Sequence, residues 1–202
     1  MAIQSKYKKR GSNLSLVVML VVLIALVVVI IKWPFGAETQ QPAEPEKELS
    51  EEEQVAATTL VNVGNMAPDF TVTMLDGREI KLSELRGNVV MVCFWATWCP
   101  PCRQELAHLQ EGVIDQFEGE KFVVLPISRG ENRDVVEKFI TDNKYTFGVG
   151  LDSDRAIYDL YASNFIPRTF VINKYGKVVY CNAGYNETIA EEVNAAIKKA
   201  LK

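Results

Sequence analysis

The sequence predicts an α/β domain that follows one membrane-spanning helix and an acidic linker. Three observations lead to this prediction: an unbroken apolar run at residues 14–31, a Pro- and Glu-rich stretch after it, and strand and helix patterns that alternate from residue 70 onwards. The 202 residues leave room for one catalytic domain of roughly 140 residues, a size at which a single core buries most of its apolar surface. A net charge of −4 and a single histidine argue against nucleic acid as a partner.

The apolar run is long enough to cross a bilayer. As a helix it would be roughly 27 Å long, close to the hydrocarbon thickness. Basic residues precede it and acidic residues follow it, so the positive-inside rule places residues 1–13 in the cytoplasm and the later residues outside. We therefore expect an anchor at residues 14–33 of a single-pass bacterial inner (cell) membrane protein with an extracytoplasmic, periplasmic C-terminal domain. A cleaved signal peptide is the alternative, but the run exceeds the usual apolar core and no small-x-small cleavage site follows promptly.

Residues 34–60 are expected to form a linker, because they are acidic and Pro-rich and offer almost nothing to bury. Within them, Ser50 and Glu53 have the spacing of a capping box, which predicts that a short helix begins there. The catalytic domain is then expected at residues 61–202.

A buried strand is predicted to end beside a pair of cysteines. Residues 89–95 are β-branched and aromatic without polar alternation, and a helical pattern follows from Pro101. Cys99 therefore lies at a helix N-terminus, where unpaired N–H groups and the helix dipole favour a thiolate. We expect Cys99, at an exposed tip, to attack disulfides, and Cys102, one turn into the helix, to be less accessible and to resolve the mixed disulfide.

Two stretches carry a family resemblance: FWATWCPPCRQEL at residues 94–106 and APDFTVTMLDGREIKLSELRG at residues 67–87. They resemble the thioredoxin superfamily, and specifically its membrane-tethered TlpA/ResA-type thiol-disulfide oxidoreductases, which carry Pro100 and Pro101 as a pair between the cysteines. The resemblance implies a thioredoxin fold with an N-terminal β-hairpin extension and a central βα insertion. It also implies reduction of disulfides in protein substrates, with apocytochrome c as a candidate, electrons from a membrane thiol donor, and neither cofactor nor metal.

The other elements follow in order along the domain. A hairpin turns at Asp76-Gly77, and Ser83 begins a turn of helix. Further elements are expected as a strand at 121–127, an insertion at 128–150 with a helix near 133–143, a helix at 153–161, strands at 169–173 and 177–182, and an amphipathic C-terminal helix ending at 201.

By resemblance, several residues support the cysteines. Pro167 matches a cis-proline beside the pair, and Ile166 would present its backbone to an extended substrate. Glu131, in Gly130-Glu131, matches a carboxylate placed beside the active site of cytochrome-maturation members; it is expected to accept the proton of Cys102 or to recognise substrate, with a solvated loop carboxylate as the alternative. Trp98 could offer an apolar docking face.

Three residues outside this group leave alternatives open. Arg168 could add positive charge to the mouth of the site or be a surface side chain at a strand start. Cys93 occupies the strand position at which thioredoxins carry a buried acid, and a small buried hydrophobe is its simplest interpretation. Cys181 is expected to be structural or incidental.

Three other function classes were weighed. Peroxiredoxins share the 67–87 pattern but place a threonine three residues before the peroxidatic cysteine, whereas Ala96 stands three before Cys99. Structural zinc needs four ligands, and only His108 lies near the cysteine pair. A peptide-binding module with no catalytic role for the cysteines is the third alternative.

Overall fold

The computed structural model describes residues 14–32 and 49–202, in two units divided between Glu48 and Leu49 that are treated separately. In the first unit, helix α1 (Leu14–Lys32) is long and apolar enough to cross a membrane, with a mean hydropathy of 3.2 over Ser15–Lys32. The predicted cytoplasmic tail and most of the predicted linker lie outside the described residues.

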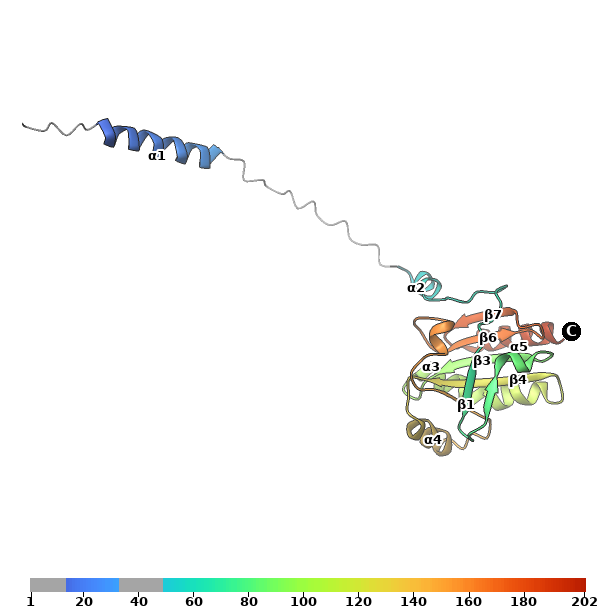
Figure 1. Cartoon of the computed structure of the whole chain (residues 1–202). Coiled ribbons are helices and arrows are strands. Elements are labelled where there is room, and N and C mark those ends of the chain that lie inside the picture. Colours follow the sequence, from blue (N-terminus) through green and yellow to red (C-terminus); the bar gives the residue numbers. More distant parts are fainter. Residues whose placement is uncertain (1–13, 33–48) are drawn as a thin grey trace, which may run out of the picture. The chain divides into compact units, whose positions relative to one another are not determined.

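The second unit is built on one mixed sheet in the order β2-β1-β5-β4-β3-β6-β7 (Figure 1). The central strand β3 pairs in parallel with β4 and antiparallel with β6, and the β1-β2 hairpin closes one edge. The predicted thioredoxin fold with its hairpin extension and βα insertion is confirmed. The strands are β1 (Thr71–Met74), β2 (Glu79–Lys81), β3 (Val89–Trp95), β4 (Phe122–Arg129), β5 (Gly150–Asp152), β6 (Arg168–Ile172) and β7 (Val178–Ala183).

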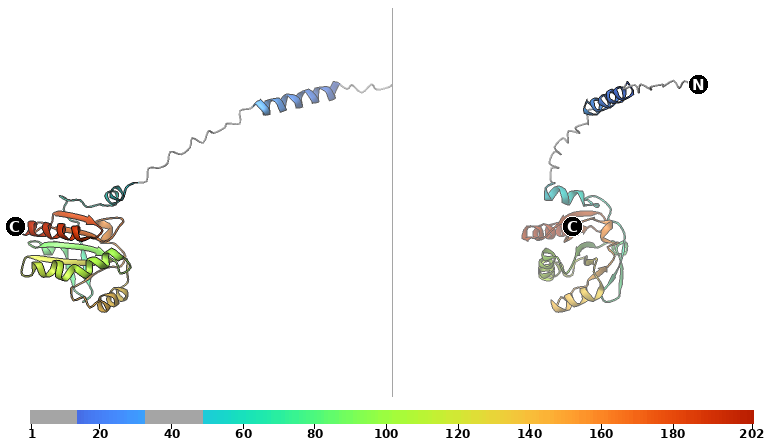
Figure 2. Two further views of the ribbon diagram at one scale, coloured as in Figure 1. Left: turned by 180° about the vertical axis from the view of Figure 1, so that it is seen from behind. Right: turned by 90° about the vertical axis from the view of Figure 1, so that its left-hand side faces the viewer.

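Three helices cover one face of the sheet, as the right-hand view of Figure 2 shows. Their apolar sides pack on the same buried cluster as the odd-numbered residues of β3. These helices are α3 (Pro100–Leu109), α4 (Arg133–Asp142) and α5 (Glu187–Leu201), and α2 (Glu51–Ala57) precedes the sheet in the chain.

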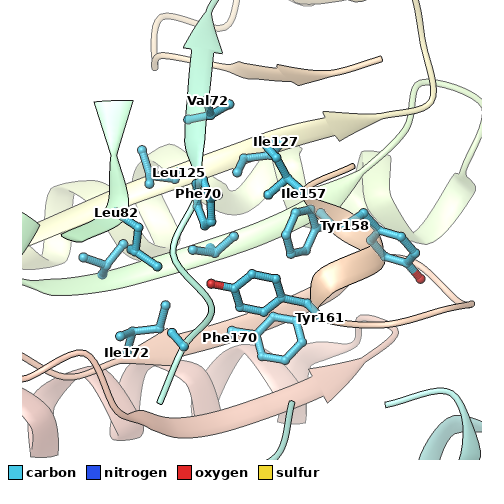
Figure 3. Close-up of a cluster of buried hydrophobic side chains, with 14 of the residues drawn as sticks. Phe70, Val72, Leu82, Leu125, Ile127, Ile157, Tyr158, Tyr161, Phe170 and Ile172 are labelled. Atoms are coloured by element: carbon cyan, nitrogen blue, oxygen red, sulfur yellow. The ribbon is translucent and has the colours of Figure 1, made fainter. Parts of the chain in front are cut away.

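The opposite face of the sheet is covered by the chain before β1 and by the segment between β5 and β6. Side chains alternate across β3, so Val92 and Phe94 face this second cluster while Cys93 and Trp95 face the helices. Figure 3 shows part of this cluster, including Tyr158 and Tyr161. The rings of these two tyrosines each lie 5.4 Å from that of Phe94, centroid to centroid. The domain therefore has two cores, and the end of β3 emerges between them.

The prediction of a helix at residues 153–161 is wrong. Turns occupy most of that segment, and only Tyr158–Leu160 form a short 3-10 helix. Arg155 adopts a φ of +66°, and the Asp152 carboxylate accepts the backbone N–H groups of Ile157 and Tyr158. A buried carboxylate thus takes the donors that a helix would have used. The helix that begins at Pro100 also loses regularity, because a π-turn follows it at Gln110–Ile114.

Helix α2 is fixed to the domain by a buried arginine. Its predicted capping box at Ser50 is confirmed. Both interpretations of Arg168 are wrong, since the side chain is 1% exposed and its guanidinium donates to α2 and the residues after it. The acceptors there are the Val55 carbonyl at 3.2 Å, the Thr58 hydroxyl at 2.8 Å and the Thr59 hydroxyl at 2.6 Å, and the guanidinium also donates to the Asn164 carbonyl at 3.1 Å. The compact second unit, Leu49–Lys202, therefore includes α2.

Replacing Arg168 with methionine should release α2. The substitution keeps the apolar stem but leaves buried oxygens without donors, so we expect the free energy of unfolding to fall by about 3 kcal/mol. Hydrogen exchange should show loss of protection concentrated in Glu51–Thr59. Arg78→Met, which removes an exposed arginine of the hairpin, is the matched control and should leave both quantities unchanged; equal protection of α2 in the two variants would contradict this role of Arg168.

Candidate active site

The two cysteines lie where β3 passes into α3. Cys99 is the N-cap residue of α3, and its Sγ accepts the backbone N–H of Cys102 at 3.3 Å. Pro100 and Pro101 fill the first two helical positions, which suits proline but removes two N–H groups. The Cys102 N–H is therefore the first helix donor that Cys99 can use.

Cys99 and Cys102 form a disulfide, with 5.3 Å between their Cα atoms. Cys102 is completely buried, as predicted, but the predicted exposed tip at Cys99 is wrong for this oxidised state, in which the residue is 3% exposed. Its sulfur faces Cys102 and lies 3.5 Å from the carbonyl oxygen of Ile166, so both neighbours shield it. Trp98 beside it is 62% exposed.

The segment opposite the disulfide carries the predicted cis bond, between Ile166 and Pro167. Just before it, Phe165 adopts a φ of +67° and its carbonyl accepts the Tyr158 hydroxyl at 2.8 Å. The structure thus brings Pro167 and Ile166 beside Cys99, although β6 is far from α3 in the sequence.

Glu131 holds the loop that leads to Cys99. It is 9% exposed, and its carboxylate accepts the Thr97 N–H at 2.8 Å, the Thr97 hydroxyl at 2.5 Å and the Ser128 hydroxyl at 3.1 Å. The alternative of a solvated loop carboxylate is wrong. Because Thr97 precedes Cys99 by two residues, this contact fixes the approach to α3.

A second buried carboxyl group, Glu105, lies on the inner side of α3 and was missed by the sequence analysis. One oxygen accepts the thiol of Cys93 at 3.0 Å, and the other accepts the hydroxyl of Thr169 at 2.8 Å. The sequence feature that could have revealed Glu105 is its position three residues after Cys102, because residues three apart lie on one face of a helix. Cys93 is thus a buried hydrogen-bond donor and more than a small hydrophobe.

Burial sets the ionisation of this pair. It raises the pKa of Glu105, against the hydrogen bonds from Cys93 and Thr169 that lower it. Burial and the nearby Glu105 carboxyl raise the pKa of the Cys93 thiol. Cys93 is therefore a neutral thiol, and Glu105 can take up a proton at a higher pH than an ordinary glutamate.

The remaining candidates lie outside this constellation. His108 Nδ1 contacts the Gln104 carbonyl on the exposed side of α3, and Cys181 is a half-buried free thiol beside β6. Within residues 14–32 and 49–202, no group of three or more His, Cys, Asp or Glu side chains is arranged to hold a metal ion.

The fold and the cysteine pair define a class: a thioredoxin-fold protein whose chemistry is thiol-disulfide exchange. A family model described as AhpC/TSA matches residues 63–181, and the chain belongs to this family. The thiol-disulfide oxidoreductase ResA of Geobacillus thermodenitrificans (strain NG80-2) is 37% identical over 120 residues, which cover 59% of this chain and 68% of that protein. ResA of Bacillus subtilis (strain 168) is 34% identical over 119 residues, covering 59% and 66%.

Solved structures agree with this assignment. The crystal structure of StoA from Bacillus subtilis superposes with a TM-score of 0.56 at 28% identity, covering 64% of this chain and 96% of StoA. A thioredoxin family protein from Chlorobium tepidum TLS, described as a thiol:disulfide interchange protein, shares the fold with a TM-score of 0.60 at 24% identity, over 70% of this chain and 99% of that one. The predicted resemblance to TlpA/ResA-type proteins is confirmed, and the chain is a thiol-disulfide oxidoreductase.

The raised pKa of Glu105 predicts a pH-dependent stability. A carboxyl group that is harder to ionise when folded destabilises the fold as pH rises above its ordinary value of about 4.5. Glu105→Gln should therefore match the wild type near pH 4 and exceed it increasingly towards pH 8, by about 1.4 kcal/mol for each unit of pKa difference.

Urea unfolding of the oxidised protein between pH 4 and 8 measures this difference. Glu111→Gln, at an exposed position just after the same helix, is the control and should track the wild type throughout. A Glu105→Gln curve parallel to that of the wild type would show that burial does not perturb this carboxyl group.

Proposed function

We propose that this oxidoreductase reduces disulfides in protein substrates outside the cytoplasm, with Cys99 as the attacking thiolate and Cys102 as the resolving thiol. One observation carries the proposal: Cys99 caps α3, bonds Cys102 and lies 3.5 Å from the Ile166 carbonyl oxygen. A thiolate at that position would be stabilised by the helix and would face an incoming chain.

The reaction begins from the reduced pair. The Cys99 thiolate attacks one sulfur of a substrate disulfide, and the other substrate sulfur leaves as a thiolate that takes a proton. Cys102 then loses its proton and attacks Cys99 Sγ, so that the second substrate sulfur leaves. The enzyme ends as the disulfide seen here, and two electrons have passed to the substrate. A membrane thiol donor is proposed to return them.

We infer that Glu105 receives the Cys102 proton. It follows Cys102 by one turn on the same helix, both residues are buried, and burial raises the pKa of Glu105, which favours proton uptake. Glu131 instead binds the N–H and hydroxyl of Thr97, two residues before Cys99. We therefore propose that Glu131 positions the Cys99 loop.

Substrate is proposed to bind as an extended segment. The backbone of Ile166, next to Pro167, would pair with it, and the exposed Trp98 ring would pack on its apolar side chains. Apocytochrome c, which carries paired cysteines, is the substrate proposed from the family resemblance.

The proposed location follows from α1 and from the charge around it. Basic residues precede this helix and acidic residues follow it, which favours a retained anchor with residues 1–13 in the cytoplasm. The catalytic unit would then act near the outer surface of a bacterial inner membrane, within the distance that the linker allows.

The two cysteine roles predict different fates for serine variants. Cys102→Ser should attack a disulfide-bonded peptide and remain joined to it, because nothing displaces the product, whereas Cys99→Ser should form no adduct. Mass spectrometry after acid quench measures the adduct. Cys181→Ser should reduce the peptide at the wild-type rate. An adduct at Cys102 in the Cys99→Ser protein, at a comparable rate, would reverse the assignment.

A further inference from the structure

Arg129, the last residue of β4, is a largely buried arginine that forms no ion pair within the described residues. It is 9% exposed, and its Nε has no hydrogen-bond partner in residues 14–32 and 49–202. The ion pairs of this part of the chain involve other residues. Only Nε of the guanidinium is both enclosed and without a partner, so the two outer nitrogens remain open to a ligand. A cation this far buried without an ion pair is costly, and a bound carboxylate would offset that cost.

Two aromatic rings define where Arg129 lies. Its guanidinium carbon is 4.6 Å from the ring centroid of Tyr158 and 5.9 Å from that of Trp98. Trp98 adjoins Cys99, and the Tyr158 hydroxyl holds the carbonyl of Phe165, next to Ile166. Tyr158 lies at the border of the cluster in Figure 3. Arg129 thus contacts Trp98, the neighbour of Cys99, and Tyr158, whose hydroxyl holds the segment that faces the Cys99 sulfur.

The nearby carboxylates are engaged elsewhere. Asp152 accepts two backbone N–H groups, and Asp159 binds Arg155 at 2.8 Å. Arg155 itself stands 5.2 Å from the same Tyr158 ring, so a second cation adds to the positive charge. Burial lowers the pKa of Arg129, although the group stays charged at neutral pH. The rim of the site beside Trp98 is therefore positively charged.

We propose that Arg129 binds the carboxylate of an Asp or Glu side chain that lies within two residues of the reacting cysteine in the substrate. A guanidinium presents paired donors that match a carboxylate. Arg129 contacts the ring of Trp98, the chain neighbour of Cys99, so we place the carboxylate within about two residues, about 7 Å of extended chain, of the reacting cysteine. This inference rests on the proposed function and adds to it a preference for acidic sequences around the target disulfide.

The test uses the full-length reduced protein in detergent and a set of peptides with one internal disulfide. The peptides are identical except for Glu, Gln or Lys two residues from one cysteine. Single-turnover reduction, quenched with acid and followed by chromatography, gives the second-order rate constant. We expect the Glu peptide to react about tenfold faster than the Gln peptide, the size of effect given by one charge-assisted hydrogen bond, and the Lys peptide to be slowest.

The variants assign the preference to one side chain. Arg129→Gln should bring the Glu and Gln rates to within about twofold, and Arg129→Lys should retain part of the difference. Arg155→Gln, which removes the other cation on the same ring, is the matched control and should keep the preference. Equal rates for the Glu and Gln peptides with the wild type, or a full preference in Arg129→Gln, would overturn the inference. Failure of the wild type to reduce any peptide would overturn the proposed function, and this inference with it.

Discussion

The site depends on one junction, at which a strand buried on both faces delivers Cys99 to the first position before a helix. Packing fixes the strand, since β3 is buried along its whole length between two clusters. The loop after it is held by Glu131 through Thr97, and the segment facing it is held by Tyr158 through Phe165. Every element that touches the disulfide is thus tied down by a hydrogen bond or by packing, and the cysteines need no further support.

Polar groups buried behind this junction serve its chemistry at a cost to stability. Glu105 and Cys93 fill a space that apolar side chains could occupy, and the carboxyl is expensive to ionise there. The proposed mechanism depends on the same burial, because a carboxyl group with a raised pKa can take up and release a proton nearer neutral pH. Arg129, at the rim of the site, is a cation that forms no ion pair in the part of the chain that the structure describes.

Local patterns predicted the fold and the cysteine pair well. The apolar run of β3, the helix start after it and the capping box at Ser50 depend on neighbouring residues, and the hairpin turn depends on Asp76-Gly77. The family resemblance supplied Pro167 and the neighbourhood of Glu131. What escaped prediction were contacts between distant segments: Arg168 binds Val55, 113 residues away, and Glu105 binds Thr169, 64 residues away. Charged side chains are usually exposed, so the sequence offers no reason to expect Arg168 and Glu105 to be buried. The helix expected at 153–161 does not form, because the Asp152 carboxylate accepts backbone N–H groups that the helix would have used.

We propose that Cys99, when reduced, is held as a thiolate by the start of α3. This can be measured by alkylating the reduced full-length protein with iodoacetamide from pH 4 to 10 and quantifying each cysteine by mass spectrometry. We expect Cys99 to react with a pKa clearly below that of an ordinary free cysteine, whereas Cys93 stays unmodified in the folded protein. A Cys99 pKa at or above about 8.5, the value of an ordinary free cysteine, would contradict it.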